Sequence, residues 1–523
     1  MDDAQRDDAQ REVIAFLRDP STYPPGAAPI EVIETHASLV FLAGRHAYKL
    51  KRAVKYPYLD FSTVALRRAA CTAELRLNRR TAPQLYLEVR AISRGEGGGL
   101  VWGRPGGERP GAPEPVDFVV VMGRFAQSDL FVNLAQAGGL SAPLIYALAA
   151  HIAAFHDKAE RRPDRGGGAA LAAVAAGNVV CLRDCGEAGF AAAQIDRVDA
   201  GVRGELARVG ALLDERRAAG KVRRGHGDLH LRNVCRIDGK PVLFDAIEFS
   251  EDLASIDVLY DLAFLLMDLD HRGHGGLANL LLNRYLDLTE EDDGLAAMPL
   301  FLALRAAIRA HVTATMARHG WGGDDRAAAY AEARRYLDEA AAALEPQPAR
   351  LVAVGGRSGT GKSTLAAALA AALGRRTGAR LLRSDVLRKL HLGAEPESPL
   401  PPEAYSPEIT ARIYHDLCRR AAAALRAGYA VVIDAVALLP EERGAFADAA
   451  VAAGVPFTGL WLEAPAAAMQ ARLAARRGDA SDASGEVLRQ QLSIDPGVLD
   501  WSRIDAGGEP AATLAAARRA LLH

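Results

Sequence analysis

The 523-residue sequence has few cysteines, and their spacing does not suggest a bound metal. The five are Cys71, Cys181, Cys185, Cys235 and Cys418. The closest pair lacks the C-x-x-C spacing and has no second pair beside it, so no zinc site is predicted. An odd, sparse set is typical of proteins in a reducing compartment. We therefore expect a cytoplasmic protein.

Strong net charge, a targeting segment and a long apolar run are also absent. The formal net charge is −2, so no global field attracts nucleic acid or an anionic membrane. The first residues, Met1 to Arg6, are acidic where a signal peptide would be basic. No uninterrupted apolar run reaches about 18 residues, the length of a membrane-spanning helix. We expect no membrane partner, and the length allows about two to four domains.

Charge is also balanced within each part of the chain. Residues 351–523 carry 20 Lys and Arg against 18 Asp and Glu, and the rest of the chain carries 43 against 47. Tight nucleic-acid binding depends on neutralising phosphates. Neither part is therefore predicted to be a nucleic-acid-binding domain.

The stretch Gly356 to Ser363 fits G-x-x-x-x-G-K-[ST] at every fixed position. An apolar run, Leu351 to Val354, predicts a buried strand before it, and the Ala/Leu-rich run from Thr364 to Leu373 predicts a helix after it. The motif requires this context, in which backbone N–H groups surround a phosphate at a helix N-terminus. The alternative, an ordinary glycine-rich turn, leaves both flanks unexplained. The predicted nucleotide-binding residues here are Gly356, Arg357, Ser358, Gly359, Thr360, Gly361, Lys362, Ser363 and Thr364. Lys362 is expected to reach the β- and γ-phosphates, and Ser363 to ligate Mg²⁺.

The order of elements predicts two unlike folds. Short alternating or β-branched runs, Glu31–Thr35, Leu39–Leu42, Ala47–Lys51, Leu85–Ser93 and Asp117–Met122, predict an antiparallel sheet with one helix, Thr63–Arg80. A glycine- and proline-rich loop is predicted over residues 94–115. The pattern is helical from Ser141 to about Ala219, apart from a loop at residues 161–168, and is again mostly helical over residues 254–345. Two prolines then mark a linker at residues 346–350, before the strand that leads into Gly356.

A second informative stretch, His226 to Asn233, has the form H-x-D-x-x-x-x-N. Protein kinases carry this pattern, in which the aspartate is the catalytic base and the asparagine binds Mg²⁺. Asp238-Gly239 between two short apolar runs predicts a hairpin. The hairpin would place Asn233 beside Asp245, so that two oxygen ligands converge on Mg²⁺. Asp228 is the predicted base, and the alternative is that these side chains only cap and solvate loops.

The remaining parts of a kinase-like site are expected upstream. Lys49 and Lys51 share one face of an alternating strand. Lys49 aligns with the motif lysine, and Lys51 is the alternative. Glu74, in the following helix, is the expected partner of that lysine, although a solvated helix carboxylate is the competing interpretation. The residues from Val121 to Phe125 would lie beside the adenine.

The usual glycine-rich loop over the phosphates is missing. The turn between the first two strands is Thr35-His-Ala-Ser38, so phosphate contacts are expected from a short loop, through the Ser38 backbone N–H. His156 and His230 are expected to be structural. Asp257 and Asp261 are expected to bind the backbone of the 226–233 loop, or to cap helices.

These motifs resemble known families. His226 to Asn233 with Asp245 resembles the aminoglycoside phosphotransferase family, which has a protein-kinase-like fold, over residues 30–340. Gly356 onward resembles P-loop kinases grouped with gluconate kinase, zeta toxin and polynucleotide kinase. The whole chain resembles bacterial two-domain proteins that join these modules in this order; the stretches 47–51, 74–80 and 479–483 support that. The expected architecture is an α+β kinase-like domain at 1–345, a linker at 346–350 and an α/β P-loop domain with a parallel sheet at 351–523.

The resemblance to P-loop kinases extends to the acceptor side of the site. Asp385 is the candidate base and Arg388, three residues later on the same helix face, the candidate substrate clamp; an N-cap role for Asp385 is the alternative. Asp434 ends a buried strand and is expected on Mg²⁺. Arg472 and Arg476 share one helix face and are expected to close over the phosphates, or else to form a solvated basic face.

These observations predict a cytoplasmic, bifunctional ATP- and Mg²⁺-dependent kinase that acts on hydroxyl groups of small molecules. Chemistry at each site would be mostly positioning and electrostatics. Two alternatives are a P-loop domain that phosphorylates a polynucleotide 5′-hydroxyl, and a module that binds ATP only as a regulatory switch. The intact Asp228, Asn233 and Asp245 argue against an inactive first module.

Overall fold

The protein is described by a computed structural model that covers residues 3–35, 37–56, 59–103, 114–320, 325–475 and 480–522, with side chains from residue 10 onward. Contacts divide the chain into two compact units. The first unit comprises Met1–Asp268 and Leu304–Ala340, and the second Leu269–Ala303 and Ala341–His523. The second unit includes residues 269–303, which lie before the predicted linker. The domain boundary at residues 346–350 therefore stays a prediction.

The first unit begins with a six-stranded antiparallel sheet in the order β1-β2-β3-β8-β6-β7. The elements of this part are α1 Asp3–Arg18, β1 Glu31–Glu34, β2 Ser38–Ala43, β3 His46–Lys51, β4 Lys55–Tyr56, β5 Leu59–Asp60, α2 Val64–Asn78, β6 Tyr86–Arg94, β7 Leu100–Trp102 and β8 Pro115–Gly123. Ala43 pairs with His46, which leaves a two-residue turn where Gly44 has a φ of 56°. Turns of this kind match the twist of the flanking strands. The hairpin places both predicted lysines on β3.

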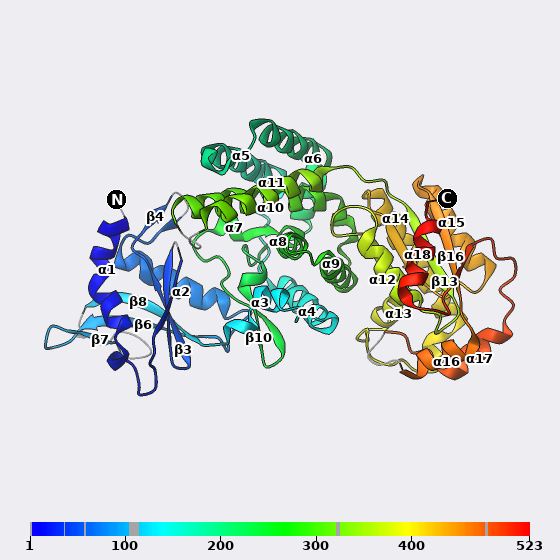
Figure 1. The fold of residues 1–523 in the computed structure, drawn as a ribbon, viewed down its shortest axis with the longest axis horizontal. Coiled ribbons are helices and arrows are strands. Elements are labelled where there is room, and N and C mark those ends of the chain that lie inside the picture. The colour runs from blue at the N-terminus through cyan, green and yellow to red at the C-terminus, as the bar shows by residue number, and fades with distance from the viewer. Residues whose placement is uncertain are drawn as a thin grey trace. The chain divides into compact units, whose positions relative to one another are not determined.

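Helix α1 lies along one face of this sheet (Figure 1). Its Val13 and Leu17 pack with Phe41, Tyr48 and Val121 of the strands in a buried apolar cluster. Burial of apolar surface is worth about 25 cal/mol per Å². The N-terminal helix is therefore part of the folded unit and stabilises the sheet that carries Lys49.

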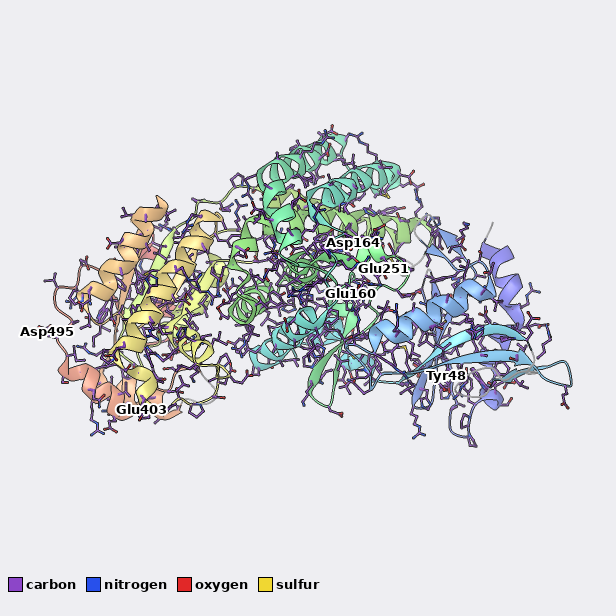
Figure 2. All side chains as sticks on the ribbon, turned by 180° about the vertical axis from the view of Figure 1, so that it is seen from behind. Tyr48, Glu160, Asp164, Glu251, Glu403 and Asp495 are labelled. Carbon is purple, nitrogen blue, oxygen red and sulfur yellow. The ribbon has the colours of Figure 1, made fainter. Side chains whose placement is uncertain are left out.

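The rest of the first unit is mainly helical. Its elements, with those that continue into the second unit, are α3 Phe131–Gln136, α4 Ala142–Lys158, α5 Gly167–Asp184, α6 Ala192–Ala218, β9 Val222–Arg224, β10 Val234–Ile237, β11 Lys240–Leu243, α7 Glu251–Ala254, β12 Ser255–Asp257, α8 Val258–His271, α10 Met298–Arg318 and α11 Arg326–Leu344. Asp164 and Glu251 lie close together (Figure 2), because Arg162 donates to both, at 3.1 and 2.7 Å. Glu251 also accepts from Arg224 (3.0 Å). This contact fixes the end of β9, which leads into the 226–233 loop.

The second unit contains a five-stranded parallel sheet in the order β14-β15-β13-β16-β17. Its elements are α9 Gly275–Thr289, β13 Leu351–Gly356, α12 Lys362–Ala372, β14 Arg380–Arg383, α13 Ser384–His391, α14 Pro407–Arg426, β15 Val431–Asp434, α15 Pro440–Ala453, β16 Phe457–Glu463, α16 Ala466–Ala475, α17 Gly485–Ser493, β17 Ser502–Asp505 and α18 Pro510–Ala520. Val352 and Val354 of β13 pack against Leu365 and Leu369 of α12 and Ala517 of α18. Strands covered on both faces are continuous apolar runs, as in the sequence of β13.

The free edge of strand β14 is covered by helix α9, which lies beside α12 (Figure 1). The amide nitrogen of Asn279 donates to the carbonyl groups of Thr377 (2.6 Å) and Ala379 (2.9 Å). The amide oxygen of Asn283 accepts the backbone N–H of Leu381 (2.7 Å). These side chains satisfy edge groups that another strand would otherwise bind. Helix α9 thus completes the sheet, although it precedes the predicted linker in the chain.

A buried ion cluster joins the segment that contains Asp287 and Asp292 to strand β14 and helix α14. Arg380 of β14 and Arg420 of α14 both donate to the carboxylate of Asp292, each at 2.6 Å. Arg380 also donates to Asp287 (2.6 Å). The side chains of Arg380 and Arg420 are 0% and 3% exposed. Burial raises the pKa of Asp292, but the two guanidinium groups outweigh it and lower the pKa below its usual value.

One sequence expectation for this fold was wrong. The segment predicted as a loop, residues 94–115, contains β7, whose Ile92–Trp102 and Arg94–Leu100 pairings with β6 stabilise a short edge strand among glycines; residues 104–113 lie outside the described part. Strand pairing decided the local structure there more than composition did. The region predicted as mostly helical, 254–345, is mostly helical, and its strand β12 pairs with β9.

One helical stretch, Glu291–Arg318, is long and apolar enough to cross a membrane. In the folded chain 72% of its most apolar window is buried. Core helices of soluble proteins have the same property, so this stretch is weak evidence for a membrane span. All five cysteines are free.

We predict that Asp292→Asn destabilises the second unit. The change leaves two buried guanidinium groups without their shared carboxylate, and breaking a buried ion pair costs about 3–5 kcal/mol. Urea unfolding at pH 7 measures the loss. Because the folded pKa is lowered, the contribution of Asp292 is present above its unfolded pKa of about 3.9 and disappears as the pH falls further. The difference between wild type and variant should therefore shrink below about pH 4.

The control is Glu463→Gln, which removes an exposed partner of Arg503 in the same unit. Exposed pairs contribute about 0–1 kcal/mol. Equal stability of the Asp292→Asn and Glu463→Gln variants would contradict a structural role for the cluster.

Candidate phosphotransfer sites

The kinase-like site of the first unit is built around one buried carboxylate, that of Glu74 on α2. The ammonium group of Lys49 lies 2.8 Å from Glu74 Oε1 and 2.5 Å from Asp245 Oδ1. Burial lowers the pKa of Lys49, but the Asp245 and Glu74 carboxylates raise it well above its usual value. The lysine is therefore a fixed cation. The structure brings together three of the predicted site residues from β3, α2 and the end of β11.

A second lysine shares the same carboxylate. Lys51 pairs with the other oxygen of Glu74 and with Glu248, and its side chain is 3% exposed. Burial raises the pKa of Glu248, and Lys51 opposes that shift without cancelling it. Of the two lysines left open by the sequence, Lys49 contacts Asp245, whereas Lys51 supports Glu74. Sequence reasoning missed Glu248, although its position three residues after Asp245 was visible.

The 226–233 loop holds the predicted base and its neighbours. The amide of Asn233 donates to the Asp228 carboxylate (3.0 Å), and His230 Nε2 lies 3.3 Å from the same oxygen. Burial raises the pKa of Asp228, but His230, His226 and Arg309 lower it more strongly, so the carboxyl group is ionised. The side chain of Asp228 is 38% exposed. It is therefore open to a substrate hydroxyl.

Two acids of α8 bind the backbone of this loop. The carboxylate of Asp261 accepts the N–H groups of His226 (2.7 Å) and Gly227 (3.0 Å), and Asp268 accepts that of Leu231 (2.9 Å). This confirms the expectation for Asp261. For Asp257 the helix-cap alternative is confirmed: its Oδ1 accepts the N–H of Leu259 (2.8 Å) in the first turn of α8. The same carboxylate pairs with a buried arginine of α6, Arg216, at 2.8 and 2.9 Å. The sequence offered no signal for that distant partner.

Both predicted histidines take part in this support. His156 Nε2 lies 3.3 Å from the same Asp261 carboxylate, and its side chain is 3% exposed. His230 Nδ1 accepts the N–H of Arg232 (3.2 Å). These contacts agree with the structural roles expected of them. The Nε2 of His230 also faces Asp228, so this ring orients the predicted base.

The hairpin β10–β11 places Asn233 and Asp245 at its open end. Val234 pairs with Leu243, and the N–H of Phe244 donates to the carbonyl of Asn233 (3.0 Å). Asp245 follows with a φ of 63°, a conformation that is uncommon for residues other than glycine. The predicted convergence of these two side chains is thus supported by backbone pairing.

Two buried residues that sequence reasoning missed fix the backbone at Asp245. The phenol of Tyr86 accepts the N–H of Asp245 (3.1 Å), and Asn78 Oδ1 accepts the N–H of Ala246 (2.8 Å). Both side chains are fully buried. They come from β6 and α2, far away in the sequence, and no local pattern marks them.

The expectation for Ser38 was wrong. Its backbone N–H donates to the hydroxyl of Thr35 (2.9 Å), and the Thr35 N–H donates back to the Ser38 carbonyl (2.9 Å). The Ser38 N–H is therefore occupied within the turn itself. His36, in the same turn, lies outside the described residues.

The loop of the second site lies between β13 and α12, as predicted. Gly356 has a φ of 135° and Gly359 a φ of 82°; a Cβ on either would lie 2.7 and 2.6 Å from the backbone oxygens of Leu462 and Met469. Only glycine fits these positions. Lys362 opens α12, and its ammonium group donates to the carbonyl of Arg357 (3.0 Å). The lysine thus folds back over the loop.

The two other predicted residues of α12, Ser363 and Thr364, lie in its first turn. Ser358 donates its backbone N–H to Gln491 of α17 (2.8 Å), and the hydroxyl of Thr360 donates to the Arg357 carbonyl (2.8 Å). The loop is therefore held by its own side chains and by α17. The contact with Gln491 was not foreseen.

Magnesium ligands are available at both sites. Asp434 ends β15 level with Val354 of β13 and accepts from Arg383 (3.2 Å). No group of three or more His, Cys, Asp or Glu side chains suited to a metal occurs in the part of the chain that the structure describes. Mg²⁺ needs no such group, because it takes one or two protein oxygens together with phosphates and water. Asn233 with Asp245, and Ser363 with Asp434, fit that donor set.

The acceptor side of the second site is formed by α13. Asp385 lies in the first turn, and the N-cap is Arg383, so the N-cap alternative for Asp385 does not hold. Burial raises the pKa of Asp385, and a hydrogen bond from Ser481 opposes the shift. Arg388 donates to the Ala404 carbonyl (2.8 Å), and its guanidinium lies 4.8 Å from the centre of the Tyr405 ring.

Two arginines, Arg472 and Arg476, are predicted to close over the phosphates, and the structure describes Arg472. It donates to the carbonyl groups of Thr360 (3.3 Å) and Gly508 (3.2 Å). The first contact places its guanidinium directly at the phosphate loop. Arg476 lies outside the described residues.

Known proteins resemble both parts of the chain. Residues 118–301 match the family model "Phosphotransferase enzyme family", and residues 351–494 match the model "AAA domain". The uncharacterized proteins Rv2004c of Mycobacterium tuberculosis and Mb2027c of Mycobacterium bovis are each 30% identical over 489 residues, which cover 92% of this chain and 93% of theirs.

Two solved structures are also similar. Amicoumacin kinase hAmiN is 14% identical, with a TM-score of 0.37, over 65% of this chain and 94% of its own. A gluconokinase from Sinorhizobium meliloti 1021 is 24% identical, with a TM-score of 0.24, over 34% of this chain and 94% of its own.

The chain joins a kinase-like module of the phosphotransferase family to a P-loop kinase-like module with a parallel sheet, which confirms the predicted fold classes and the predicted resemblance. It belongs to the family that includes the mycobacterial Rv2004c and Mb2027c.

We predict that Tyr86→Phe weakens Mg²⁺ binding at the first site. The change removes the acceptor for the Asp245 N–H but keeps the ring in place, and an unsatisfied buried donor costs about 1–3 kcal/mol. The half-saturating Mg²⁺ concentration for binding of an ATP analogue should rise about tenfold. The measurement uses the full chain with Lys362→Ala in the second site.

Tyr23→Phe is the matched control, because its buried hydroxyl donates to the Leu17 carbonyl (2.7 Å) in the cluster under α1. It should leave the Mg²⁺ requirement unchanged. A folded Tyr86→Phe variant with the wild-type requirement would show that Tyr86 does not position Asp245.

Proposed function

We propose that this protein is an ATP-dependent kinase with two phosphotransfer sites on one chain, each transferring the γ-phosphoryl group to a hydroxyl group of a small molecule such as a sugar or amino sugar. The observation that carries the proposal is the pair of separate constellations. One lies in the first unit and consists of Lys49, Glu74, Asp245, Asn233 and Asp228. The second unit has the phosphate loop, Asp434 and Asp385.

At the first site Asp228 accepts the proton of the substrate hydroxyl, the hydroxyl oxygen forms a bond to the γ-phosphorus, and ADP leaves with the bridging oxygen. Lys49, fixed by Glu74, orients the phosphates. Asn233 and Asp245 would hold Mg²⁺, which neutralises phosphate charge when bound. The low pKa of Asp228 keeps it ionised and available as an acceptor.

At the second site Asp385 has the corresponding role of base. Its raised pKa increases its affinity for the proton that it accepts. Lys362 binds the phosphates, Arg472 adds positive charge beside the loop, and Ser363 with Asp434 would hold Mg²⁺. We assign acceptor binding to Arg388, which lies on the same helix as Asp385. The geometry supports a transfer that depends on positioning and electrostatics, as is usual for phosphoryl groups.

A polynucleotide 5′-hydroxyl kinase is the second candidate for the P-loop module. The balanced charge of residues 351–523 argues against it, because tight nucleic-acid binding depends on basic contacts. We propose a cytoplasmic protein with small-molecule acceptors and no membrane partner. A screen with radiolabelled ATP against sugars, amino sugars, nucleosides and short oligonucleotides tests these assignments.

We predict two nucleotide sites for each chain, both dependent on Mg²⁺. Equilibrium binding of a non-hydrolysable ATP analogue should saturate near two per chain, and Lys362→Ala should remove one. A stoichiometry of one in fully folded wild-type protein would contradict the proposal. It would favour a module that lacks nucleotide altogether.

We also predict that the two activities separate by mutation. Asp228→Asn keeps the size of the base but removes its proton affinity, so transfer at the first site should fall by about 10²–10⁴. Lys362→Ala should abolish transfer at the second site. Each variant should retain the other activity, since distant sites without shared partners act independently. Turnover with the acceptors found in the screen is the measurement.

The matched control is Asp238→Asn, an exposed residue in the β10–β11 turn with a φ of 50°, which asparagine tolerates. It should leave both activities unchanged. If either Asp228→Asn or Lys362→Ala abolishes all turnover in a folded protein, one module acts as a regulatory switch for the other.

A further inference from the structure

One carboxylate in the second unit connects several parts of the acceptor side. Asp482 lies in the segment between α16 and α17. Its Oδ1 accepts from Lys389 (2.9 Å), and its Oδ2 accepts from the Leu400 N–H (3.0 Å) and the Tyr405 hydroxyl (2.7 Å). The three donors belong to α13, to the following loop and to the 3₁₀ helix Pro402–Tyr405. Asp482 therefore joins three segments at one point.

The charge of Asp482 is required by its surroundings. Lys389 has a side chain that is 0% exposed, and a buried ammonium group needs a counter-charge. Burial raises the pKa of Asp482, but Lys389, Tyr405 and the Leu400 N–H lower it below its usual value. The carboxylate is therefore ionised and fully engaged with its donors.

Both candidate acceptor residues depend on this segment. The ring of Tyr405 lies against the guanidinium of Arg388, which is 5% exposed. The Nε of Arg388 is buried and has no hydrogen-bond partner among the described residues, whereas its Nη1 donates to the Ala404 carbonyl (2.8 Å), in the same 3₁₀ helix as Tyr405. Ser481, beside Asp482, donates to Asp385. The pair Ser481-Asp482 thus contacts Asp385 directly and reaches Arg388 through Tyr405.

We infer that Asp482 is a positioning residue of the P-loop module: by fixing Tyr405 and Lys389 it holds Arg388 and Asp385 in the geometry that receives the acceptor. The acceptor role of Arg388 and Asp385 rests on the proposed function, whereas the contacts of Asp482 do not. The sequence before Asp482 contains the helix of Arg472, which touches the phosphate loop at Thr360. Asp482 itself belongs to the acceptor side, so its loss should affect acceptor use and not ATP use.

The first experiment needs no acceptor. Phenylglyoxal modifies accessible arginines, and peptide mass spectrometry of the full-length protein measures modification of Arg388. In wild type the buried guanidinium should be protected. Asp482→Asn should increase its modification rate about tenfold or more, because the released Tyr405 ring uncovers it. Asp448→Asn, an exposed acid on α15, is the matched control and should leave protection unchanged.

A second variant separates positioning from stability. Asp482→Asn leaves Lys389 buried without a counter-charge and could unfold the unit. The double variant Asp482→Asn/Lys389→Met removes both charges, and Lys389→Met alone keeps the bond from Tyr405 to Asp482. Arg388 should be exposed in the double variant and protected in Lys389→Met. Protection of Arg388 in the folded double variant would overturn the inference.

The second experiment measures turnover at the P-loop site with an acceptor from the screen, in the Asp228→Asn background. In the double variant kcat/KM for the acceptor should fall about 10²-fold, as for a misplaced binding group, while KM for ATP stays unchanged. An unchanged acceptor kcat/KM despite exposure of Arg388 would overturn the inference. If Arg388 becomes exposed but wild type phosphorylates none of the acceptors, the proposed function fails and the positioning contact stands.

Discussion

The pairing of buried charges around Glu74 is the constraint on which the kinase-like site depends. Its fully buried carboxylate takes two lysines, and two buried cations cannot be balanced by one acid. Asp245 and Glu248 supply the remaining negative charge. The cluster therefore holds three acids against two lysines. Such a cluster attracts a cation more readily than a bare anion, which agrees with a nucleotide that arrives together with a divalent metal.

The same rule organises the second unit. Arg380 and Arg420 are buried and share Asp292, and the buried Lys389 has Asp482. In each case the acid comes from a segment distant in sequence. An uncompensated buried charge costs several kcal/mol, so these acids fix which segments pack together. This explains why residues 269–303 belong to the same compact unit as the sheet that carries Arg380.

What could be predicted from the sequence is what depends on local chemistry. Short-range features of the sequence specify three segments: the phosphate loop, the 226–233 loop and the β10–β11 hairpin. In each, turn residues, apolar runs and fixed spacings within about twenty residues determine the local geometry. Lys49 and Glu74 could be paired because strand alternation places Lys49 on one face of its strand and the kinase motif expects a lysine there with a glutamate in the following helix.

The missed residues act through long-range contacts that leave no local mark. Tyr86 and Asn78 reach the backbone of Asp245 and Ala246 only in the folded chain. Glu248 follows Asp245 closely, but its partner Lys51 lies 197 residues away in the sequence. Asp257 shows both kinds of contact. Its cap on the first turn of α8 is local and was among the alternatives that the sequence left open, whereas its pairing with Arg216 of α6 is long-range and was not foreseen.

The predicted linker shows the limit of composition as a guide to boundaries. Prolines mark residues 346–350 as an irregular connection, yet the edge of strand β14 is bound by Asn279 and Asn283, which lie before that connection and inside the range of the phosphotransferase family model. The strand continues directly into α13, which carries Asp385 and Arg388. Backbone groups at a sheet edge must find partners. The placement of the acceptor residues thus depends on a helix that linear sequence comparison assigns to the other module, and a connection that is irregular in sequence need not separate structures that fold independently.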